Sequence, residues 1–212
     1  MSRPKNKEEI ILSAALNVFI EKGFSNSSIK DIADTAGIGK GTIYEYFNNK
    51  NELFIKTVDF EINQRCQQAR NAIESKTTFM DKFNALIDMA QEAAEEDLKH
   101  IKFLISNTSM GLGHEYKVEF QNLLQKMTGT MESIISQTLI QGKTEGKIGE
   151  IDLEFASRII NSFFMWYIRD VYCKKWLNEQ KWSNEQRQEE KANLINLIMH
   201  GICISRKQFP QY

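Results

Sequence analysis

The chain has 212 residues, with 27 Lys and Arg, 28 Asp and Glu and a formal net charge of −1. This length is enough for a substantial hydrophobic core, either in one large domain or in a small domain joined to a larger one. The near-neutral charge excludes a general positive field that attracts the whole protein to nucleic acid. Residues 1–56 hold eight basic and seven acidic side chains, so DNA binding there has to depend on individually placed charges.

The cysteines and the N-terminal segment indicate the compartment. Cys66, Cys173 and Cys203 lie far apart and form no Cys-x-x-Cys pair, which favours a reducing environment. The N-terminus has no apolar signal region, and no stretch approaches the roughly 18 apolar residues that span a bilayer. We therefore expect a cytoplasmic protein without a membrane partner.

The first predicted helix covers residues 6–22. Its apolar residues recur at three- and four-residue spacing, which gives one broad hydrophobic face. These residues are Ile10, Ile11, Ala14, Ala15, Val18 and Phe19. Gly23 is expected to end the helix, because glycine adopts the left-handed backbone conformation of a helix C-terminus. Ahead of this face, Arg3, Lys5 and Lys7 form a small basic arm that suits contacts to phosphates.

A second helix is predicted from Ser28 to Ala36. Ser28 and, three positions later, Asp31 form a variant of the capping box that begins a helix. Ile29, Ile32 and the two alanines at positions 33 and 36 give it one apolar face, and Gly37 closes it. A helix followed by a glycine turn and another short helix is the pattern of a helix-turn-helix.

The third predicted helix covers residues 40–47, with Ile43 and Phe47 on its inward face. The residues that point away from this face or flank it are Lys40, Gly41, Thr42, Tyr44, Glu45 and Tyr46. A glycine inside so short a helix costs about 1 kcal/mol relative to alanine, so we expect it to have a reason. Close approach of the helix backbone to DNA is such a reason.

A further helix begins after Asn49, which caps it with Glu52 at the third position. Lys50 falls in the first turn, where the helix dipole disfavours a cation, and a bound phosphate would remove this conflict. The helices before and after the turn are expected to share a small core. Its predicted members are Val18, Phe19, Phe24, Ile29, Ile32, Ile43, Phe47 and Leu53.

These residues resemble the TetR family of bacterial transcriptional regulators. The resemblance is strong over roughly the first quarter of the chain, and it is carried by Gly23, Ser28, Ile32, Ala33, Ala36, Gly37, Lys40, Gly41, Thr42, Tyr44, Tyr46, Phe47, Lys50, Leu53 and Phe54. One position departs from the pattern: Gly39 stands where members of the family commonly carry Ser or Thr. Glycine is an adequate helix cap, but it cannot supply a side-chain contact to a phosphate.

The resemblance implies a DNA-binding site on the second and third helices and the start of the helix that follows them. Its expected members are Ser28, Gly39, Lys40, Gly41, Thr42, Tyr44, Tyr46 and Lys50. We expect the backbone at Gly41 and the side chains of Lys40 and Thr42 to approach base edges, and the two tyrosines and Lys50 to bind phosphates. Glu45 also faces outward, either to accept from a cytosine amino group or to stay clear of the DNA backbone.

The remainder of the chain is predicted to be helical. A helix from residue 51 leaves the motif as a connector, and further helices are expected near residues 79–90, 101–105, 120–139, 155–176 and 184–205, with a loop marked by Gly142, Gly146 and Gly149. The expected fold is all-α with about nine helices. We expect a DNA-binding domain over residues 1–50 and a helical effector-binding and dimerisation domain over residues 51–212.

No pattern indicates catalysis, a metal or a cofactor. Gly142, Lys143 and Thr144 resemble the end of a phosphate-binding loop, but Gln137 stands where that loop requires a glycine. The three histidines are scattered without the paired spacing of a metal site, and no arrangement of nucleophile and base is visible. An enzyme is therefore the least favoured class.

The apolar run of residues 163–168 covers most of a helix circumference, so it is expected to be buried on more than one side. The simplest interpretation of this run is that it forms part of a hydrophobic core. The family resemblance adds pairing of the last two helices with a second copy and a pocket among the middle helices. The predicted pocket residues are Asn107, Phe120, Met127, Phe163, Trp166, Tyr167 and Asp170. Their methionine and aromatic side chains favour a large apolar or aromatic effector.

The sequence therefore favours a ligand-responsive regulator that binds palindromic double-stranded DNA as a homodimer and is released by a small-molecule effector, acting as a repressor. The alternative is an all-helical small-molecule-binding or protein-adaptor module that does not bind DNA. The outward face of residues 40–46 is small and polar, whereas a helix that binds a protein groove carries apolar anchors at helical spacing.

Overall fold

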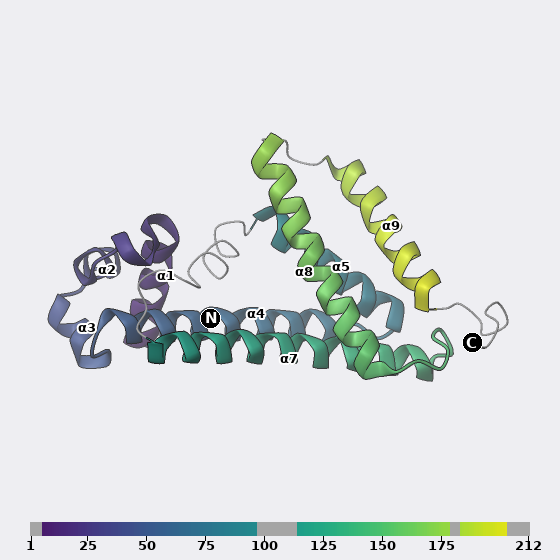
Figure 1. The fold of residues 1–212 in the computed structure, drawn as a ribbon, viewed down its shortest axis with the longest axis horizontal. Helices are drawn as coiled ribbons and strands as arrows, with labels where there is room; N and C mark the ends of the chain where they lie inside the picture. Colours follow the sequence, from purple (N-terminus) through teal and green to yellow (C-terminus); the bar gives the residue numbers. More distant parts are fainter. Residues whose placement is uncertain (1–5, 97–113, 179–182, 203–212) are drawn as a thin grey trace. The chain divides into compact units, whose positions relative to one another are not determined.

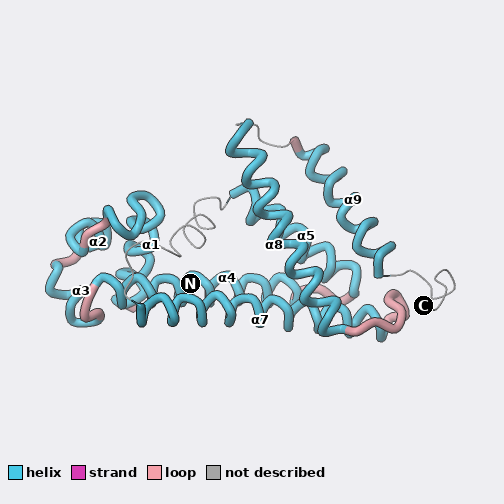
Figure 2. Tube along the Cα trace, in the orientation of Figure 1, coloured by secondary structure: helices cyan, strands magenta, loops and turns pink. Residues whose placement is uncertain are grey.

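The computed structural model describes residues 6–96, 114–178 and 183–202, and within these ranges it contains eight α-helices and no strand (Figures 1 and 2). The predicted all-α fold class is therefore confirmed. The helix expected near residues 101–105 lies outside the described residues. Among the described helices, none is both long enough and apolar enough to cross a membrane.

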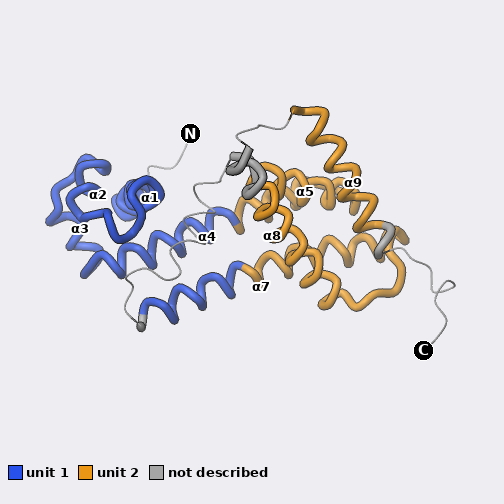
Figure 3. Tube along the Cα trace, turned by 45° about the horizontal axis from the view of Figure 1, so that its top comes forward, with its two compact units in different colours: residues 1–65, 99–127 blue, residues 66–98, 128–212 orange. Residues whose placement is uncertain are grey.

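The chain packs as two compact units, one of residues 1–65 and 99–127 and the other of residues 66–98 and 128–212 (Figure 3). Helices α4 (Lys50–Glu74) and α7 (His114–Thr144) each contribute residues to both units. The domain boundary expected at residue 50 stays a prediction.

The first unit contains α1 (Lys7–Asn26), α2 (Ile29–Ala36), α3 (Lys40–Tyr46) and the beginning of α4. Of the eight residues predicted to form its core, seven are buried and Ile29 is half-buried. Phe54 of α4 extends this core, because its ring centroid lies 5.2 Å from that of Phe19 and 4.9 Å from that of Phe24. Helix α4 is thus anchored in the same core as the three short helices.

Gly23 interrupts α1 but does not end it. The residue has φ 75° and ψ 162°, so the helical backbone breaks there as predicted. The chain then makes a further turn as far as Asn26, which corrects the predicted end. Phe24 is only 4% exposed, and the Ser27 hydroxyl donates a hydrogen bond to its carbonyl at 2.8 Å, so packing and hydrogen bonding hold this extra turn in place.

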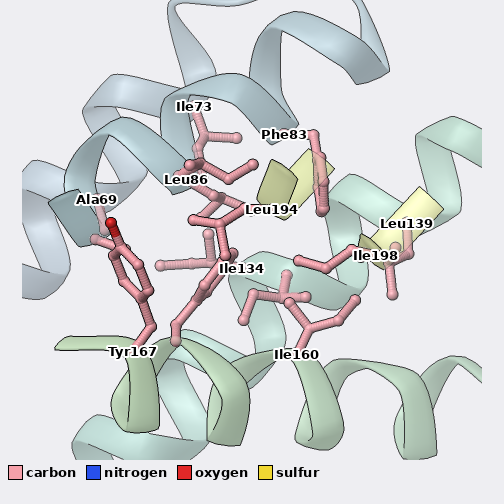
Figure 4. Close-up of a cluster of buried hydrophobic side chains, with 14 of the residues drawn as sticks. Ala69, Ile73, Phe83, Leu86, Ile134, Leu139, Ile160, Tyr167, Leu194 and Ile198 are labelled. Atoms are coloured by element: carbon pink, nitrogen blue, oxygen red, sulfur yellow. The ribbon is translucent and has the colours of Figure 1, made fainter. Parts of the chain in front are cut away.

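The second unit contains α5 (Phe79–Glu96), α8 (Leu153–Asn178), α9 (Asn184–Ile202), the end of α4 and most of α7. Their apolar faces meet in one cluster, shown in Figure 4. Members labelled there include Ile73, Phe83, Leu86, Ile134, Leu139, Ile160, Tyr167 and Leu194. This cluster gives the second unit a hydrophobic core of its own.

Gly142 lies in the last turn of α7 and not in the predicted loop, which begins only after Thr144. A Cβ atom at this position would lie 2.6 to 2.9 Å from side-chain atoms of Ile148 and Phe79. Glycine is needed here because two buried side chains pack against the helix backbone. The expectation of a loop was wrong at this residue because a glycine required by packing gives the same sequence signal as a glycine required by a turn.

Candidate functional site

Helix α2 begins at a complete capping box. The Ser28 hydroxyl accepts a hydrogen bond from the backbone N–H of Asp31 at 3.2 Å, and the Asp31 carboxylate accepts from the backbone N–H of Ser28 at 2.8 Å. The same carboxylate forms an ion pair with the Lys22 ammonium group of α1 at 2.6 Å. The hydrogen bonds from Lys22 and then from Ser28 lower the pKa of Asp31 from 3.8 to about 2. The predicted cap is confirmed, whereas a contact between Ser28 and DNA stays a prediction.

Helix α3 is held by two buried side chains and presents the rest of its surface to solvent. Ile43 is fully buried, and Phe47, which ends the helix, is 3% exposed. Six of the residues predicted to contact DNA lie together on α3 and its N-terminal cap. Thr42 is half-buried, and the exposed residues are Gly39, Lys40, Gly41, Tyr44 and Tyr46.

Contacts within the protein do not require glycine at position 39 or 41. A Cβ atom at either position would have no neighbouring atom within 4 Å. Gly39 caps α3 with φ −74° and ψ 149°, a conformation open to other residues, and it offers no side-chain hydrogen bond to the first turn. The first turn of α3 therefore has two positions without side-chain bulk, which allows another molecule to approach the backbone closely.

The Lys50 side chain, expected to bind a phosphate, is directed into the protein. Its ammonium group donates to the backbone carbonyls of Phe24 at 2.7 Å and of Ser27 at 2.9 Å, and it lies 4.5 Å from the centroid of the Phe24 ring. Burial lowers the pKa of Lys50. The carbonyls offset the unfavourable helix dipole that we had expected a phosphate to offset. Sequence reasoning missed this contact because the partners are backbone atoms 26 and 23 residues away.

The residues predicted to bind an effector are distributed over both units. Phe120 and Met127 belong to the first unit, whereas Phe163, Trp166, Tyr167 and Asp170 lie on α8 in the second, and Asn107 lies outside the described residues. Phe120 is 2% exposed and its ring stacks on that of Phe54, with centroids 6.1 Å apart. Its side chain is thus part of the core of the first unit, and a pocket shared by all seven residues stays a prediction.

Tyr167 is the predicted pocket residue with an unusual environment. It is 2% exposed inside the apolar cluster of Figure 4, and its hydroxyl has no hydrogen-bond partner among the described residues. Burial raises the pKa of Tyr167, and the carboxylates of Glu190 and Asp170 add to this shift. A weak interaction with the Gln91 side chain opposes it, but this amide donates its hydrogen bond to the Arg187 carbonyl and does not meet the geometry of a hydrogen bond to Tyr167. Leaving a buried hydroxyl without a partner costs about 1–3 kcal/mol. A bound molecule with a hydrogen-bond acceptor would remove this cost.

A groove of about 500 Å³ runs along the outer faces of α8 and α9. Its lining is almost entirely apolar and includes Phe155, Ile159 and Leu197, which are 55%, 53% and 62% exposed. Phe155 and Ile159 lie four residues apart, and Trp166, 49% exposed, continues the same stripe seven residues further along α8. Contiguous apolar surface of this kind marks an interaction site. Among the described residues, no cluster of three His, Cys, Asp or Glu side chains could hold a metal ion.

Comparison with known proteins finds similarity to bacterial transcriptional regulators. Residues 11–57 match the sequence profile of the family described as bacterial regulatory proteins, tetR family. The chain is 30% identical over 142 residues to the uncharacterized HTH-type transcriptional regulator YvdT of Bacillus subtilis (strain 168), covering 66% of this chain and 71% of that protein.

A curated relative and a solved structure, both from Bacillus subtilis, extend the comparison. The chain is 27% identical over 164 residues to the fatty acid metabolism regulator protein of Bacillus subtilis (strain 168), covering 74% of this chain and 78% of that protein. Among solved structures, the transcriptional regulator FadR from Bacillus subtilis in complex with stearoyl-CoA superposes with a TM-score of 0.64 and 24% identity. That superposition covers 92% of this chain and 98% of the other.

Proposed function

This chain belongs to the tetR family of bacterial regulatory proteins and is a DNA-binding transcriptional regulator, and we propose that it acts as a homodimeric repressor that an apolar effector releases from its operator. The observation that carries the proposal is the outward surface of α3. It is exposed, it holds one lysine and two tyrosines, and it has two glycines that packing does not require. This combination fits a helix whose backbone lies against DNA.

The proposed contacts divide the surface of α3 between bases and phosphates. The backbone at Gly41 and the side chains of Lys40 and Thr42 approach base edges in the major groove, where hydrogen-bonding groups distinguish the base pairs. Tyr44 and Tyr46, 55% and 39% exposed, donate hydroxyl hydrogen bonds to phosphates on either side. Phosphate contacts set the register of the helix, and base contacts set the specificity.

A second copy of the chain is the proposed occupant of the apolar groove on α8 and α9. The stripe of Phe155, Ile159 and Trp166 exposes apolar surface whose burial is favourable, and a twofold axis allows the same stripe on each copy to cover the other. A dimer of this kind carries two copies of α3. It can therefore bind two half-sites of a palindrome, about 34 Å apart along the DNA.

The proposed effector is a long-chain fatty acyl-CoA. One relative described above is a fatty acid metabolism regulator protein, and the transcriptional regulator FadR with a similar fold was solved in complex with stearoyl-CoA. The core of the second unit supports this class, because Met80, Met89, Met131 and Met199 pack against it and methionine adapts readily to an inserted chain. Tyr167 supplies a hydroxyl that can donate to the carbonyl of an acyl thioester.

Fluorescence anisotropy with labelled DNA from upstream of the protein's own gene tests both the DNA-binding surface of α3 and the effector class. Lys40→Ala and Tyr44→Ala should each weaken binding at least tenfold, about 1.4 kcal/mol, with unchanged unfolding in urea. Stearoyl-CoA should then release wild-type protein from the DNA at concentrations where free coenzyme A has no effect. If both variants bind DNA as tightly as wild type, the assignment of the α3 surface to DNA is wrong. If neither stearoyl-CoA nor coenzyme A releases the protein, only the proposed effector class is wrong.

A further inference from the structure

Lys50 joins two segments that are distant in the sequence. It is the first residue of α4, and its ammonium group is bound to the last turn of α1 by hydrogen bonds to the Phe24 and Ser27 carbonyls. The group also lies over the face of the Phe24 ring, so carbonyl oxygens and an aromatic face, both of which attract a cation, surround it. All these contacts lie within the first unit.

The segment that Lys50 holds is the entrance to the helix-turn-helix. Gly23 interrupts α1, and residues 24–27 lead directly to Ser28, the cap of α2. The end of a helix leaves carbonyl groups without partners inside the helix, and these groups need donors from elsewhere. Lys50 donates to the Phe24 carbonyl, which also accepts from the Ser27 hydroxyl, and to the carbonyl of Ser27, the cap that follows the helix.

Apolar contacts hold the same segment from the other side. Phe24 is buried against Phe19 and Phe54, with ring centroids 5.9 and 4.9 Å away. These contacts fix the depth of the segment in the core, but hydrophobic contacts are non-directional. The two hydrogen bonds from Lys50 add direction, because each carbonyl must point at the ammonium group.

We propose that Lys50 is a positioning residue for DNA recognition: it ties the first turn of α4 to the chain entering α2, and thereby sets the orientation of α2 and α3 at the end of α4. In this arrangement two of the three N–H donors of the Lys50 ammonium group are committed to backbone carbonyls, and the side chain is directed into the protein rather than toward a phosphate. The inference rests on the DNA-binding function stated above and assigns a different task to one of its expected residues.

The test compares Lys50→Met with Lys40→Met in the full chain, using the same labelled upstream DNA at several salt concentrations. Methionine keeps an unbranched side chain and removes the charge. Removal of one phosphate contact makes the slope of log K against log salt shallower by about 0.9, so removal of one contact from each subunit of a dimer makes it shallower by about 1.8. We expect Lys50→Met to weaken binding at least tenfold at every salt concentration while its slope stays within about 0.3 of the wild-type slope.

Circular dichroism shows which variants are folded, and DNA binding is compared only among folded variants. If Lys50→Met is not fully folded, Lys50→Gln replaces it, because its amide can still donate to one carbonyl. Amide hydrogen exchange at Ser27 and Ser28 gives a second readout, and it should rise in either variant and remain unchanged in Lys40→Met. Lys50→Arg, which keeps two donors and a cation over the ring, should recover most of the affinity.

The outcomes separate this inference from the proposed function. A slope shallower by about 1.8 in the folded Lys50 variant would show a phosphate contact and overturn the inference. Wild-type affinity in that variant would also overturn it, because the tie would then have no effect on recognition. Failure of wild-type protein to bind DNA would count against the DNA target instead.

Discussion

Replacement of Gly41 by alanine should stabilise the free protein and weaken its binding to DNA. Position 41 is exposed in the first turn of α3, and an added Cβ atom meets nothing within 4 Å. In a helix, alanine is favoured over glycine by roughly 0.5–1 kcal/mol, because glycine loses more backbone freedom on folding. No contact within the protein opposes this gain, so the free energy of unfolding should rise by up to that amount.

The DNA complex should respond in the opposite direction. If the backbone at Gly41 lies against base edges, a methyl group there has to displace the helix or the contacting base. Moving the helix outward lengthens the hydrogen bonds of Lys40 and Thr42 to the bases, and each good base contact is worth about 1–3 kcal/mol. Loss of one such hydrogen-bonded pair weakens binding roughly 5- to 150-fold.

Gly129 provides the matched control. It lies inside α7, it is exposed, and an added Cβ atom there also meets nothing within 4 Å. Gly129→Ala should therefore stabilise the protein by a similar amount and leave DNA binding unchanged. Urea unfolding at 25 °C measures the first quantity and fluorescence anisotropy the second. Wild-type affinity for DNA in Gly41→Ala would refute the argument that this glycine permits close approach.

Three further changes test other parts of the molecule. The lowered pKa of Asp31 stabilises the fold above pH 3.8, and this contribution disappears as the pH falls through about 2; Asp31→Asn should thus be less stable than wild type in urea at pH 7, and the difference should close as the pH falls below about 2. Tyr167→Phe removes a buried hydroxyl without a partner, so stability should stay the same or rise by up to about 1 kcal/mol, whereas the stearoyl-CoA concentration that releases DNA should increase at least fivefold. Ile159→Glu should convert a dimer to a monomer of 24.6 kDa in light scattering without loss of helix content.

Each of these changes has an outcome that contradicts its premise. A difference between Asp31→Asn and wild type that stays undiminished as the pH falls below about 2 would mean that the carboxylate charge is not the source of the stability. Marked destabilisation by Tyr167→Phe would show that the hydroxyl has a partner in the free protein. A dimer that survives Ile159→Glu would place the second copy on another surface.

The helix-turn-helix was predictable because each of its features is local in the sequence. A cap and its carboxylate lie three residues apart, so Ser28 and Asp31 could be paired without knowledge of the fold, and the structure confirms them. The same holds for the left-handed residue Gly37, with φ 68°, and for the spacing that buries Ile43 and Phe47. Short-range geometry determines these features, and short-range geometry can be read from the sequence.

Long-range contacts were not predictable in the same way. The role of Lys50 depends on carbonyl groups of α1, and carbonyl groups carry no sequence signal because every residue has one. The pocket expected at Phe120 stays a prediction, and the stacking of its ring on Phe54 in the first unit was not foreseen. The sequence marks an aromatic residue for burial, but the identity of its neighbours depends on the tertiary packing.

The recognition helix depends on its surroundings more than most helices do. Helix α3 has seven residues, no side-chain hydrogen bond at its cap and a glycine in its first turn, so its own sequence gives it little stability. Its order comes from Ile43 and Phe47 in the core of the first unit, and that core includes Phe24 and Phe54. Because Lys50 holds the backbone of Phe24 and Phe54 lies on the same helix as Lys50, a displacement at the start of α4 acts on this core directly. A helix with little stability of its own has to follow, and this is the property that a switchable DNA-binding surface needs.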